Sequence, residues 1–583
     1  MRLHDNELYF GLHEDHHDKE TKCISLFVFD SKYFQPQSCC DSSYDSIWCG
    51  PHAAQSLIEA VTCLRESLRD RGGELVVRSG DPSIWIPLIA DQVGATEIWY
   101  SHEPGTHEQE VVQKLQQHFI TTCGKVVKWK GVMGYTLYHP NDLPADGDTW
   151  NRLAHPKQKH KKHNTKQPQP HSSSTFSALH CNLEIEDVDV PQNRLQGMCH
   201  IMGDFRKAAR AATNVRPLLL APKQLHLPTI TSQVEPGDIP TLEELMQPLE
   251  QYLQNTTKKL KLFGLDHSTI EHVLEAARTN RNQRHAQHIL IHGERAARQQ
   301  WTTFLKEGHA AKADRSLADV SNHNSSRLSV HLALGTLSPR SIYWAVQQQD
   351  DQEDCQWLAR HLEMRDFFLY TALRSGPQLY QAEGLLPLLG KKKTKANKNS
   401  TAATSIPWKS PQDHSEAWKR WATGHTGLPL VDAGMHELMA TGYCSNRVRQ
   451  NVASVLTKDL VMDWRAGAEW FQFCLEDHCV GANYGNWCYF AGVGSDPKQR
   501  HFRTVSQHKK YDPKGDYSLK WLASLRTFVE ENSSDKREAA FRPWDFGVPG
   551  FASPLVDPQT QYTWQDAEML RETGTLLSHQ LSS

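Results

Sequence analysis

The chain has no hydrophobic run long enough to cross a membrane. A transmembrane helix needs about 20 mostly apolar residues, and no such stretch occurs in these 583 residues. The 13 cysteines are scattered without a C-x-x-C pair, and only Cys39 and Cys40 are adjacent. This usage indicates reduced thiols in an intracellular protein and excludes a disulfide framework.

Two further absences bear on the ligands. No G-x-G-x-x-G follows a predicted strand, so the dinucleotide fingerprint of a Rossmann domain is missing. The net charge is only −3, which neither requires nor excludes nucleic acid, so a nucleic-acid binder would need a local basic patch. The length suggests roughly two to four domains.

Residues 1–149 have the pattern of an α/β domain. Short apolar runs alternate with helical periodicity, which predicts right-handed crossovers and a doubly wound parallel sheet. The predicted strands are Cys23–Phe29, Glu74–Val77, Glu97–Tyr100 and Val126–Trp129, and the predicted helices are Ala54–Leu68, Pro82–Val93 and Val111–Phe119.

Two polar segments interrupt the rest of the chain. Residues 150–195 predict a long linker, rich in Lys, His, Gln, Pro and Ser. Its histidines His155, His160 and His163 lack an accompanying carboxylate or thiol framework, so we predict no metal site. Residues 388–405 form a second, Lys-rich insertion, interpreted as a solvated loop with weak phosphate attraction as the alternative. Residues 564–583 are a short tail.

Residues 196–563 otherwise show helical periodicity, so the C-terminal domain is predicted to be all-α. The candidate helices are Leu242–Asn255, Ser268–Asn280, Glu294–Leu305, Ser338–Gln349, Gln356–Leu373, Glu416–Ala422 and Asp432–Thr441.

The stretch Asn446–Tyr489 predicts two helices followed by a tight polar turn. Asn446 and Arg449 are three residues apart and share a helix face. Asp463 is a good N-cap for the second helix. The turn then brings Asp477, Asn483 and Trp487. An Arg, an Asp and an Asn beside a Trp indicate either a buried ion pair with a capped loop or a binding site.

The segment Ser325–Ser329 precedes a helical run at Val330–Leu334. Hydroxyls beside the free N–H groups of a helix start can hold a phosphate. A simple serine N-cap is the alternative interpretation.

Together these pieces resemble the photolyase/cryptochrome family, and within it cryptochrome DASH. The resemblance covers nearly the whole chain outside the two insertions. The matching phrases are RLHDNE from Arg2, GELVVRSGDP from Gly73, YTLYHPNDLP from Tyr135, SSRLSVHLALGTLSPR from Ser325, MRDFF from Met364, TGLPLVDAGMHELMATGYCSNRVRQNVAS from Thr426, TKDLVMDWRAGAEWF from Thr457, ANYGNWCYFAGVGSDP from Ala482 and YDPKGDY from Tyr511.

The resemblance implies FAD, held in a U-shape within the helical domain. An anionic reduced flavin needs a compensating cation, which the pair Arg449–Asp477 would supply. Asn483 matches the residue that faces the reactive N5 of the flavin. The implied cofactor-binding residues are Ser325, Ser326, Leu328, Ser329, Arg365, Asn446, Arg449, Asp477 and Asn483, with Cys479 in a place where a carboxylate is usual.

Tryptophan is concentrated in the C-terminal part, with ten of the 17 lying between Trp357 and Trp564. Trp487 and Trp464 match the family's electron-hopping chain, which reduces FAD in light. We predict Trp408 as the third member, with Trp418 as the alternative because the spacing here is three residues longer than usual. Core packing is the other interpretation of each.

Three departures from the family bear on the reaction. His361 stands where a glutamate usually contacts the lesion, and Met364 stands where a tryptophan stacks on the damaged bases. Because a flexible thioether is a poor stacking surface, recognition of pyrimidine dimers should weaken by a few kcal/mol, at about 1–3 per stacked base. Cys479 replaces a flavin-facing carboxylate, and a thiol is a weak acceptor.

The N-terminus also departs from the family, because only Met1 precedes Arg2 where a central strand is usual. A doubly wound sheet without that strand would leave two half-sheets with unpaired facing edges. We therefore expect a strand, and any targeting peptide, upstream of Met1. Intracellular location in an organelle (plastid or mitochondrion), the nucleus or the cytoplasm stays open.

The resemblance implies light-driven repair of cyclobutane pyrimidine dimers, preferentially in single-stranded DNA. Gln450 and Tyr489 would line the lesion cavity beside Met364 and His361. The expected phosphate contacts, each with plain surface charge as its alternative, are Arg447, Arg500, Arg503, Lys509 and Lys510.

Two other functions stay open. One is a blue-light photoreceptor with weak or no repair activity, which His361 and Met364 favour. The other is a binder of single-stranded nucleic acid, RNA included, that keeps FAD for structural reasons. A folate antenna (methenyltetrahydrofolate) in the N-terminal domain and a monomeric state are expected from the resemblance.

Overall fold

The computed structural model describes thirteen segments of the chain: residues 1–9, 22–38, 45–121, 127–156, 194–225, 234–255, 262–286, 292–308, 325–349, 352–389, 406–496, 500–532 and 534–563. Nearly all of the predicted linker and Lys-rich insertion, and the whole tail, lie outside the described residues. Among the described helices, none combines the length and apolar character needed to cross a bilayer.

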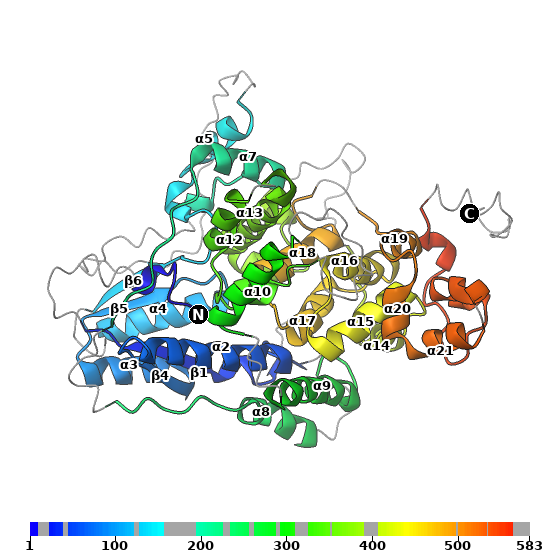
Figure 1. Ribbon diagram of the computed structural model, residues 1–583, viewed down its shortest axis with the longest axis horizontal. Helices are drawn as coiled ribbons and strands as arrows, with labels where there is room; N and C mark the ends of the chain where they lie inside the picture. The colour runs from blue at the N-terminus through cyan, green and yellow to red at the C-terminus, as the bar shows by residue number, and fades with distance from the viewer. Residues whose placement is uncertain are drawn as a thin grey trace.

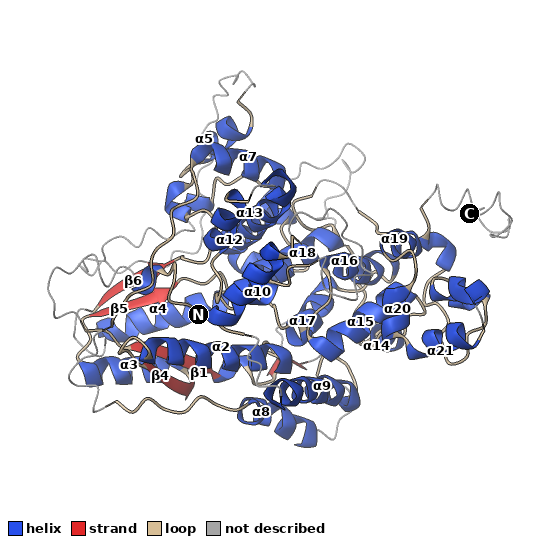
Figure 2. Cartoon of the chain, viewed as in Figure 1, coloured by secondary structure: helices blue, strands red, loops and turns tan. Residues whose placement is uncertain are grey.

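The four predicted parallel strands are present at one end of the molecule (Figure 2). Strand β1 (Ser25–Asp30) pairs with β4 (Leu75–Gly80), and β5 (Glu97–Ser101) pairs with β6 (Lys128–Val132), both in parallel. In the described part of the chain these pairs are two separate sheets. The predicted strands therefore form two half-sheets in place of one continuous sheet.

The helices of the α/β part follow the predicted periodicity. Helix α3 (Pro82–Val93) starts after Asp81, whose side chain accepts a hydrogen bond from the Ser83 amide, and it ends at Gly94 in the left-handed conformation. Helices α2 (Pro51–Arg69) and α4 (Thr106–Thr121) complete this part, and the short antiparallel pair β2 (Gln37–Ser38) and β3 (Asp45–Ser46) was not predicted.

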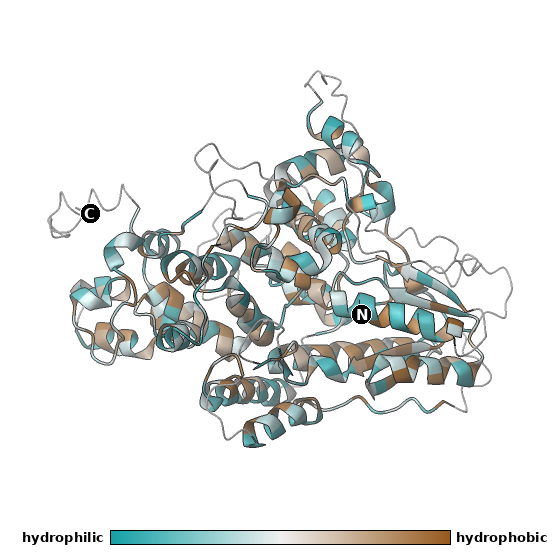
Figure 3. Ribbon diagram, turned by 180° about the vertical axis from the view of Figure 1, so that it is seen from behind, coloured by the Kyte–Doolittle hydropathy of each residue, from teal (hydrophilic) through white to brown (hydrophobic). Residues whose placement is uncertain are grey.

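The remaining described chain is helical, as predicted, with α8 and α9 lying beneath α2 in Figure 1. Figure 3 shows many helices divided between hydrophobic and hydrophilic faces, as expected when one side packs on a core. The α-helices are α5 (Gly147–Ala154), α7 (Met202–Ala212), α8 (Leu242–Asn255), α9 (His267–Ala286), α10 (Glu294–Lys306), α11 (Ser329–Ala333), α12 (Pro339–Gln347), α13 (Gln352–Ser375), α14 (Ser415–Ala422), α15 (Pro429–Thr441), α16 (Asn446–Ser454), α17 (Trp464–Cys474), α18 (Val480–Ala491), α19 (Thr504–Tyr511), α20 (Asp516–Trp521) and α21 (Ala523–Glu531).

The start predicted for the linker is wrong. Trp150, its first residue, is fully buried in α5 and stacks on Phe205 of α7, with ring centroids 5.7 Å apart. The polar composition that begins a few residues later hid this contact, because one aromatic side chain can anchor a helix whose other positions are polar.

The first residues of the chain lie between the α/β part and the helical part, near α10 (Figure 1). Arg2 is buried, and its guanidinium donates to the backbone oxygens of His4, Asp5, Gly134 and Gly335. One side chain therefore ties the N-terminal segment to the loop after β6 and to the turn after α11.

Candidate functional site

The stretch Asn446–Tyr489 forms three helices and not two with a turn. Asp463 is the predicted N-cap of α17, and its side chain accepts from the Arg465 amide. The predicted turn around Asn483–Trp487 is instead the middle of α18. That helix forms because its apolar residues are buried and because Gly485 allows a close approach: a Cβ there would lie 2.5 Å from the Phe368 ring of α13.

A π-helix follows α16 and shapes the next connection. It spans Val455–Asp459 and places Val455, Leu456 and Thr457 in the core. Such π segments are rare and often occur at functional sites. Here it turns the chain from α16 toward α17.

Arg449 of α16 and Asp477, just before α18, form the predicted ion pair. Arg449 Nη2 lies 3.0 Å and 2.9 Å from the two carboxylate oxygens, and Nε donates to the Cys444 carbonyl at 2.8 Å. Burial alone would lower the pKa of Arg449, but the Asp477 carboxylate outweighs it and holds that pKa above its ordinary value. The site therefore keeps a fixed positive charge at every physiological pH.

Tyr443, which was not among the predicted site residues, connects this ion pair to the serine segment. The guanidinium of Arg327 lies over the Tyr443 ring at 4.4 Å, and that of Arg449 approaches it at 5.6 Å. The hydroxyls of Ser325 and Tyr443 are 3.3 Å apart. Two cations and two hydroxyls thus gather on one aromatic ring. The position of Tyr443, two residues before the Ser445 cap of α16, is the signal that could have found it.

The interpretation of the serine segment as a simple N-cap is wrong, and its role in holding a phosphate stays a prediction. Helix α11 has only five residues, its N-cap is the buried Leu328, and no side chain caps it. Ser325 Oγ instead accepts from the Arg327 amide, where φ is +47°, and the Ser326 carbonyl accepts from Gln300. Ser329 is exposed. The segment is a bent loop that presents hydroxyls and Arg327 together.

The other predicted cofactor residues differ in how deeply their side chains are buried. Arg365 is partly buried and donates to the backbone oxygens of Tyr135 (2.7 Å) and Leu332 (3.0 Å), so it joins the loop after β6 to α11. Asn483 is buried, and its amide donates to the Ala468 carbonyl at 2.9 Å. Asn446, although one turn from Arg449, is exposed.

Cys479 and His478 follow Asp477 directly. Cys479 is the N-cap of α18 but makes no side-chain capping bond, and burial raises the pKa of its thiol. In the described part of the chain, neither ring nitrogen of His478 has a partner, although both are buried. Burial lowers the pKa of His478 to about 4. At neutral pH both side chains are therefore uncharged, and the His478 ring offers one donor and one acceptor.

Two of the four predicted tryptophans donate to the same backbone oxygen, and the other two are buried elsewhere. Trp464 is fully buried and Trp408 is partly buried, and both donate their indole N–H to the Ala382 carbonyl, at 3.1 Å and 3.3 Å. Trp487 is buried against Phe471, with ring centroids 5.2 Å apart. Trp418, the alternative third member, is fully buried in α14. Only Trp408 of these four reaches the surface.

The predicted substrate residues lie on three helices, with Tyr489 on α18 and the others on α13 and α16. His361 is exposed on α13 with Met364 one turn later, and its ring meets Trp357 edge-on at 5.3 Å. On α16, Arg447 donates to Gln450 (2.8 Å) and lies over the Tyr511 ring at 4.4 Å.

The predicted phosphate contacts are mostly engaged within the protein. Arg500 pairs with Asp496 at 2.8 Å and lies 5.9 Å from the Tyr489 ring. Lys509 pairs with Glu538 at 2.8 Å, and Arg503 donates to the Thr560 carbonyl. Lys510 is exposed beside Tyr511, at 5.4 Å. The surface that remains is a set of cations on aromatic rings, which suits stacked bases as well as phosphates.

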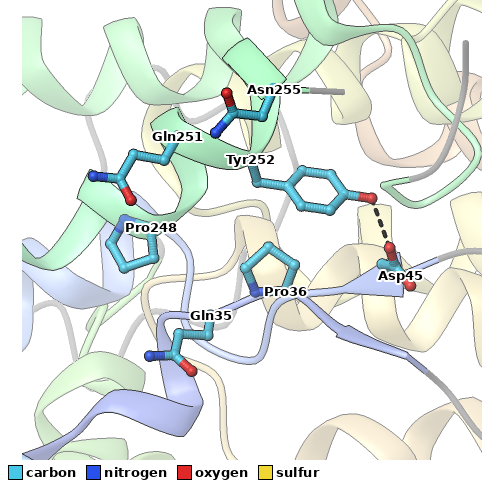
Figure 4. Close-up of a pocket in the computed structure, with 7 residues that line it drawn as sticks. All are labelled: Gln35, Pro36, Asp45, Pro248, Gln251, Tyr252 and Asn255. Atoms are coloured by element: carbon cyan, nitrogen blue, oxygen red, sulfur yellow. Dashed lines mark hydrogen bonds between the residues drawn. The ribbon is translucent and has the colours of Figure 1, made fainter. Parts of the chain in front are cut away.

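A separate pocket of about 440 Å³ lies between α8 and the β2–β3 hairpin (Figure 4). Tyr252 donates its hydroxyl to Asp45 at 2.6 Å on one wall. Prolines and side-chain amides form the rest. None of the predicted site residues lines this pocket, so it is distinct from the Arg449–Asp477 region.

The residues around Arg449 suit a flavin nucleotide. The ion pair, the Asn483 amide and the unpartnered His478 ring supply donors and acceptors of the kind that the polar edge of a flavin requires. Arg327 and the serine hydroxyls suit a pyrophosphate. Cys479 fits least well, because a neutral thiol is a weak acceptor.

Comparison with known proteins shows which family this chain resembles in sequence and fold. Residues 357–571 match the model of the FAD binding domain of DNA photolyase, and residues 1–173 match that of DNA photolyase. Cryptochrome DASH from Danio rerio is 30% identical over 534 residues, covering 90% of this chain and 82% of the relative. Cryptochrome DASH from Gloeobacter violaceus is 31% identical over 532 residues, covering 90% and 84%.

Solved structures agree. The cryptochrome of Synechocystis sp. PCC6803 superposes with a TM-score of 0.67 at 29% identity, covering 98% of this chain and 96% of that one. A class III photolyase from Agrobacterium tumefaciens, with a TM-score of 0.62 at 20% identity, shows the shared fold. The chain therefore belongs to the photolyase/cryptochrome family, and it carries that family's FAD-binding domain. Within the family, its sequence is similar to the cryptochrome DASH proteins.

Proposed function

We propose that this protein binds FAD at the Arg449–Asp477 pair and uses light to repair cyclobutane pyrimidine dimers, preferentially in single-stranded DNA. The observation that carries the proposal is the fixed ion pair between Arg449 and Asp477, which directly precedes the helix that buries Asn483 and Trp487. The match to an FAD-binding domain supports the cofactor.

Different groups of residues would hold the flavin ring, bind the phosphates and transfer electrons. Arg449, held by Asp477, compensates the negative charge of the reduced ring, and Asn483 meets the ring at the atom whose protonation changes. Ser325, Ser326 and Arg327 hold the phosphates. Bound FAD supplies light absorption and a one-electron donor for the dimer. Trp464 and Trp408, bonded to one carbonyl, relay electrons from the surface toward Trp487.

The face formed by Arg447, Gln450 and Tyr511 would receive the nucleic acid. A guanidinium stacked on a ring offers a flat cationic surface to an unpaired base. Met364 and His361 on α13 offer less stacking area than a tryptophan, so a flexible single strand is the easier substrate. RNA is the alternative single-stranded ligand.

The deciding experiment illuminates purified, reduced holoprotein with dimer-containing oligonucleotides and measures loss of the dimer in single and double strands. Loss in single strands, faster than in duplex, is expected. The variant Asp477→Asn should lose bound FAD, because it leaves a buried cation unpaired. Asp496→Asn is the matched control, since it breaks an exposed pair of similar length. Full FAD retention by Asp477→Asn would contradict the assigned site.

A second candidate function is a blue-light photoreceptor with little repair activity. The exposed His361 and the half-buried Met364 on α13, which offer little stacking surface to damaged bases, favour it. Normal photoreduction of bound FAD, with no dimer loss in either kind of DNA, would select this function.

Three further proposals follow from the relatives. A folate antenna in the α/β part is tested by extracting pterin from the holoprotein. The Arabidopsis thaliana relative, described as chloroplastic/mitochondrial and 29% identical, supports an organelle location, which imaging of the tagged native protein tests. The monomeric state is tested by light scattering.

A further inference from the structure

Trp421, which was not predicted, and Trp418, the alternative third member of the predicted chain, form a second row of rings that starts at Trp487. The Trp487 and Trp421 rings meet edge-to-face, with centroids 6.2 Å apart at 71°. Trp421 in turn stacks on Trp418, with centroids 5.3 Å apart at 23°. Trp421 and Trp418 lie one turn apart on α14 and are fully buried. The row therefore leads from Trp487 to two rings in the core.

Solvent exposure, and not hydrogen bonding, distinguishes the two rows. Trp421 donates its N–H to the Val452 carbonyl at 3.0 Å, Trp418 donates to the Phe263 carbonyl at 2.8 Å, and Trp408 donates to the Ala382 carbonyl at 3.3 Å. An indole that has lost an electron becomes acidic at Nε1, but a backbone carbonyl is too weak a base to take that proton. Trp408 is partly exposed, so water can take its proton, whereas Trp418 and Trp421 are fully buried.

We propose that Trp421 and Trp418 are a reversible side branch of the electron path. This proposal rests on the proposed function. Trp487 loses one electron when light excites the cofactor, Trp421 refills it with one electron, and Trp418 then gives one electron to Trp421. Each indole keeps its N–H proton. The same electrons return in reverse order, so the branch stores the positive charge and consumes no external reductant.

The stacked pair favours the charge for two reasons. A positive charge is attracted to the face of a neighbouring aromatic ring, and each N–H points at the negative end of a carbonyl, which stabilises the charged form. Stacked aromatic pairs favour association by an amount that corresponds to roughly two- to tenfold in an equilibrium. A positive charge that stays on the stacked pair does not reach Trp408. At Trp408, loss of the indole proton to water would make the electron transfer irreversible.

The test uses FAD-loaded protein with a thiol in solution as the external electron donor. Flash absorption measures the tryptophan radical cation, and steady illumination measures the yield of lasting photoreduction. Trp418→Phe should shorten the buried radical's survival and raise the yield roughly twofold or more. Trp408→Phe should lower the yield. Trp470→Phe is the matched control, because Trp470 is equally buried, donates to the Ala422 carbonyl and stacks on Phe473 outside the branch.

A second measurement needs no cofactor. The stacked pair should give an exciton couplet in the near-ultraviolet circular dichroism of the flavin-free protein, lost in Trp418→Phe and Trp421→Phe but kept in Trp470→Phe. If Trp418→Phe photoreduces like wild type, or with a lower yield, the side branch is wrong while the path through Trp464 stands. If no variant and no wild type binds FAD, the proposed function and the branch both fail.

Discussion

Cys479 lies in the candidate site where the family resemblance predicts a carboxylate. Its thiol is neutral at physiological pH because burial raises its pKa, while Arg365 opposes that rise. Cys479→Asp should tighten FAD binding by roughly tenfold or more, since a hydrogen bond to a charged group contributes about 1.5–3 kcal/mol. Fluorescence titration of flavin-free protein with FAD measures this, with Cys479→Ser as the size-matched control. Equal affinity in all three proteins would remove Cys479 from the cofactor site.

Glu476 is a second unusual residue, an acid next to Asp477 with its side chain 15% exposed and 3.8 Å from His292. Burial raises the pKa of Glu476 from 4.5 to about 7. Because the folded state then binds the proton more tightly than the unfolded state, this group favours folding fully below about pH 4.5. That contribution is lost as the pH rises through 7.

Glu476→Gln cannot titrate, so the variant should lose less stability than wild type between pH 5 and pH 8. The expected difference is roughly 1–3 kcal/mol in the free energy of unfolding. Urea unfolding at pH 5, 6, 7 and 8 measures it. Glu110→Gln, at an exposed position of α4, should follow the wild-type curve. Parallel curves for Glu476→Gln and wild type would contradict the raised pKa.

At the scale of elements, the contact between α18 and α13 depends on a missing side chain. A Cβ at Gly485 would lie 2.5 Å from the Phe368 ring. Gly485→Ala should therefore cost about 1–3 kcal/mol of stability by overpacking. Gly203→Ala is the control: it is also helical, with nothing within 4 Å of the added methyl, so it should be neutral or stabilise by up to about 1 kcal/mol. Thermal unfolding of both variants measures these changes in stability.

Most helices could be predicted because their apolar residues recur at the helical period, as in Leu242–Asn255, whose bounds the structure confirms. Helix α18 could not, because Asn483, Gly485 and Asn486 have the composition of a turn. Tertiary packing overrides that preference, since Tyr484 and Trp487 are buried on either side of the glycine. The serine N-cap was predicted wrongly for the opposite reason. The hydroxyls of this segment suit a cap, but the backbone bends at Arg327 before the helix begins.

Within the site, the ion pair was the feature that could be predicted from the sequence. Arg449 and Asp477 meet as expected. Tyr443 and Trp421 were missed because their roles depend on which rings and cations the fold brings to them, and no spacing within the sequence encodes those contacts.

At the scale of the whole molecule, Arg2 holds the α/β part and the helical part together. Its guanidinium donates to carbonyls of Asp5, Gly134 and Gly335, from three regions of the chain. Arg2→Ala would leave the Asp5 and Gly134 carbonyls unpaired, at about 1–3 kcal/mol each, while the Gly335 carbonyl keeps its bond from the Met1 amino group. The variant should unfold at least about 2 kcal/mol more easily in urea. The exposed Lys207→Ala should stay within about 0.5 kcal/mol of wild type, and an equal effect of both variants would contradict the role of Arg2.

The shared carbonyl of Ala382 has a consequence for mutational tolerance. Two indoles are anchored to one main-chain atom, so their mutual placement is set by the path of the backbone and not by the identity of residue 382. Any side chain that keeps that path leaves the spacing intact. We therefore expect substitutions at this position to leave both indole bonds in place, whereas an insertion or deletion in the same turn would shift both rings at once. To change the spacing of the proposed relay, loop length there is the feature to alter.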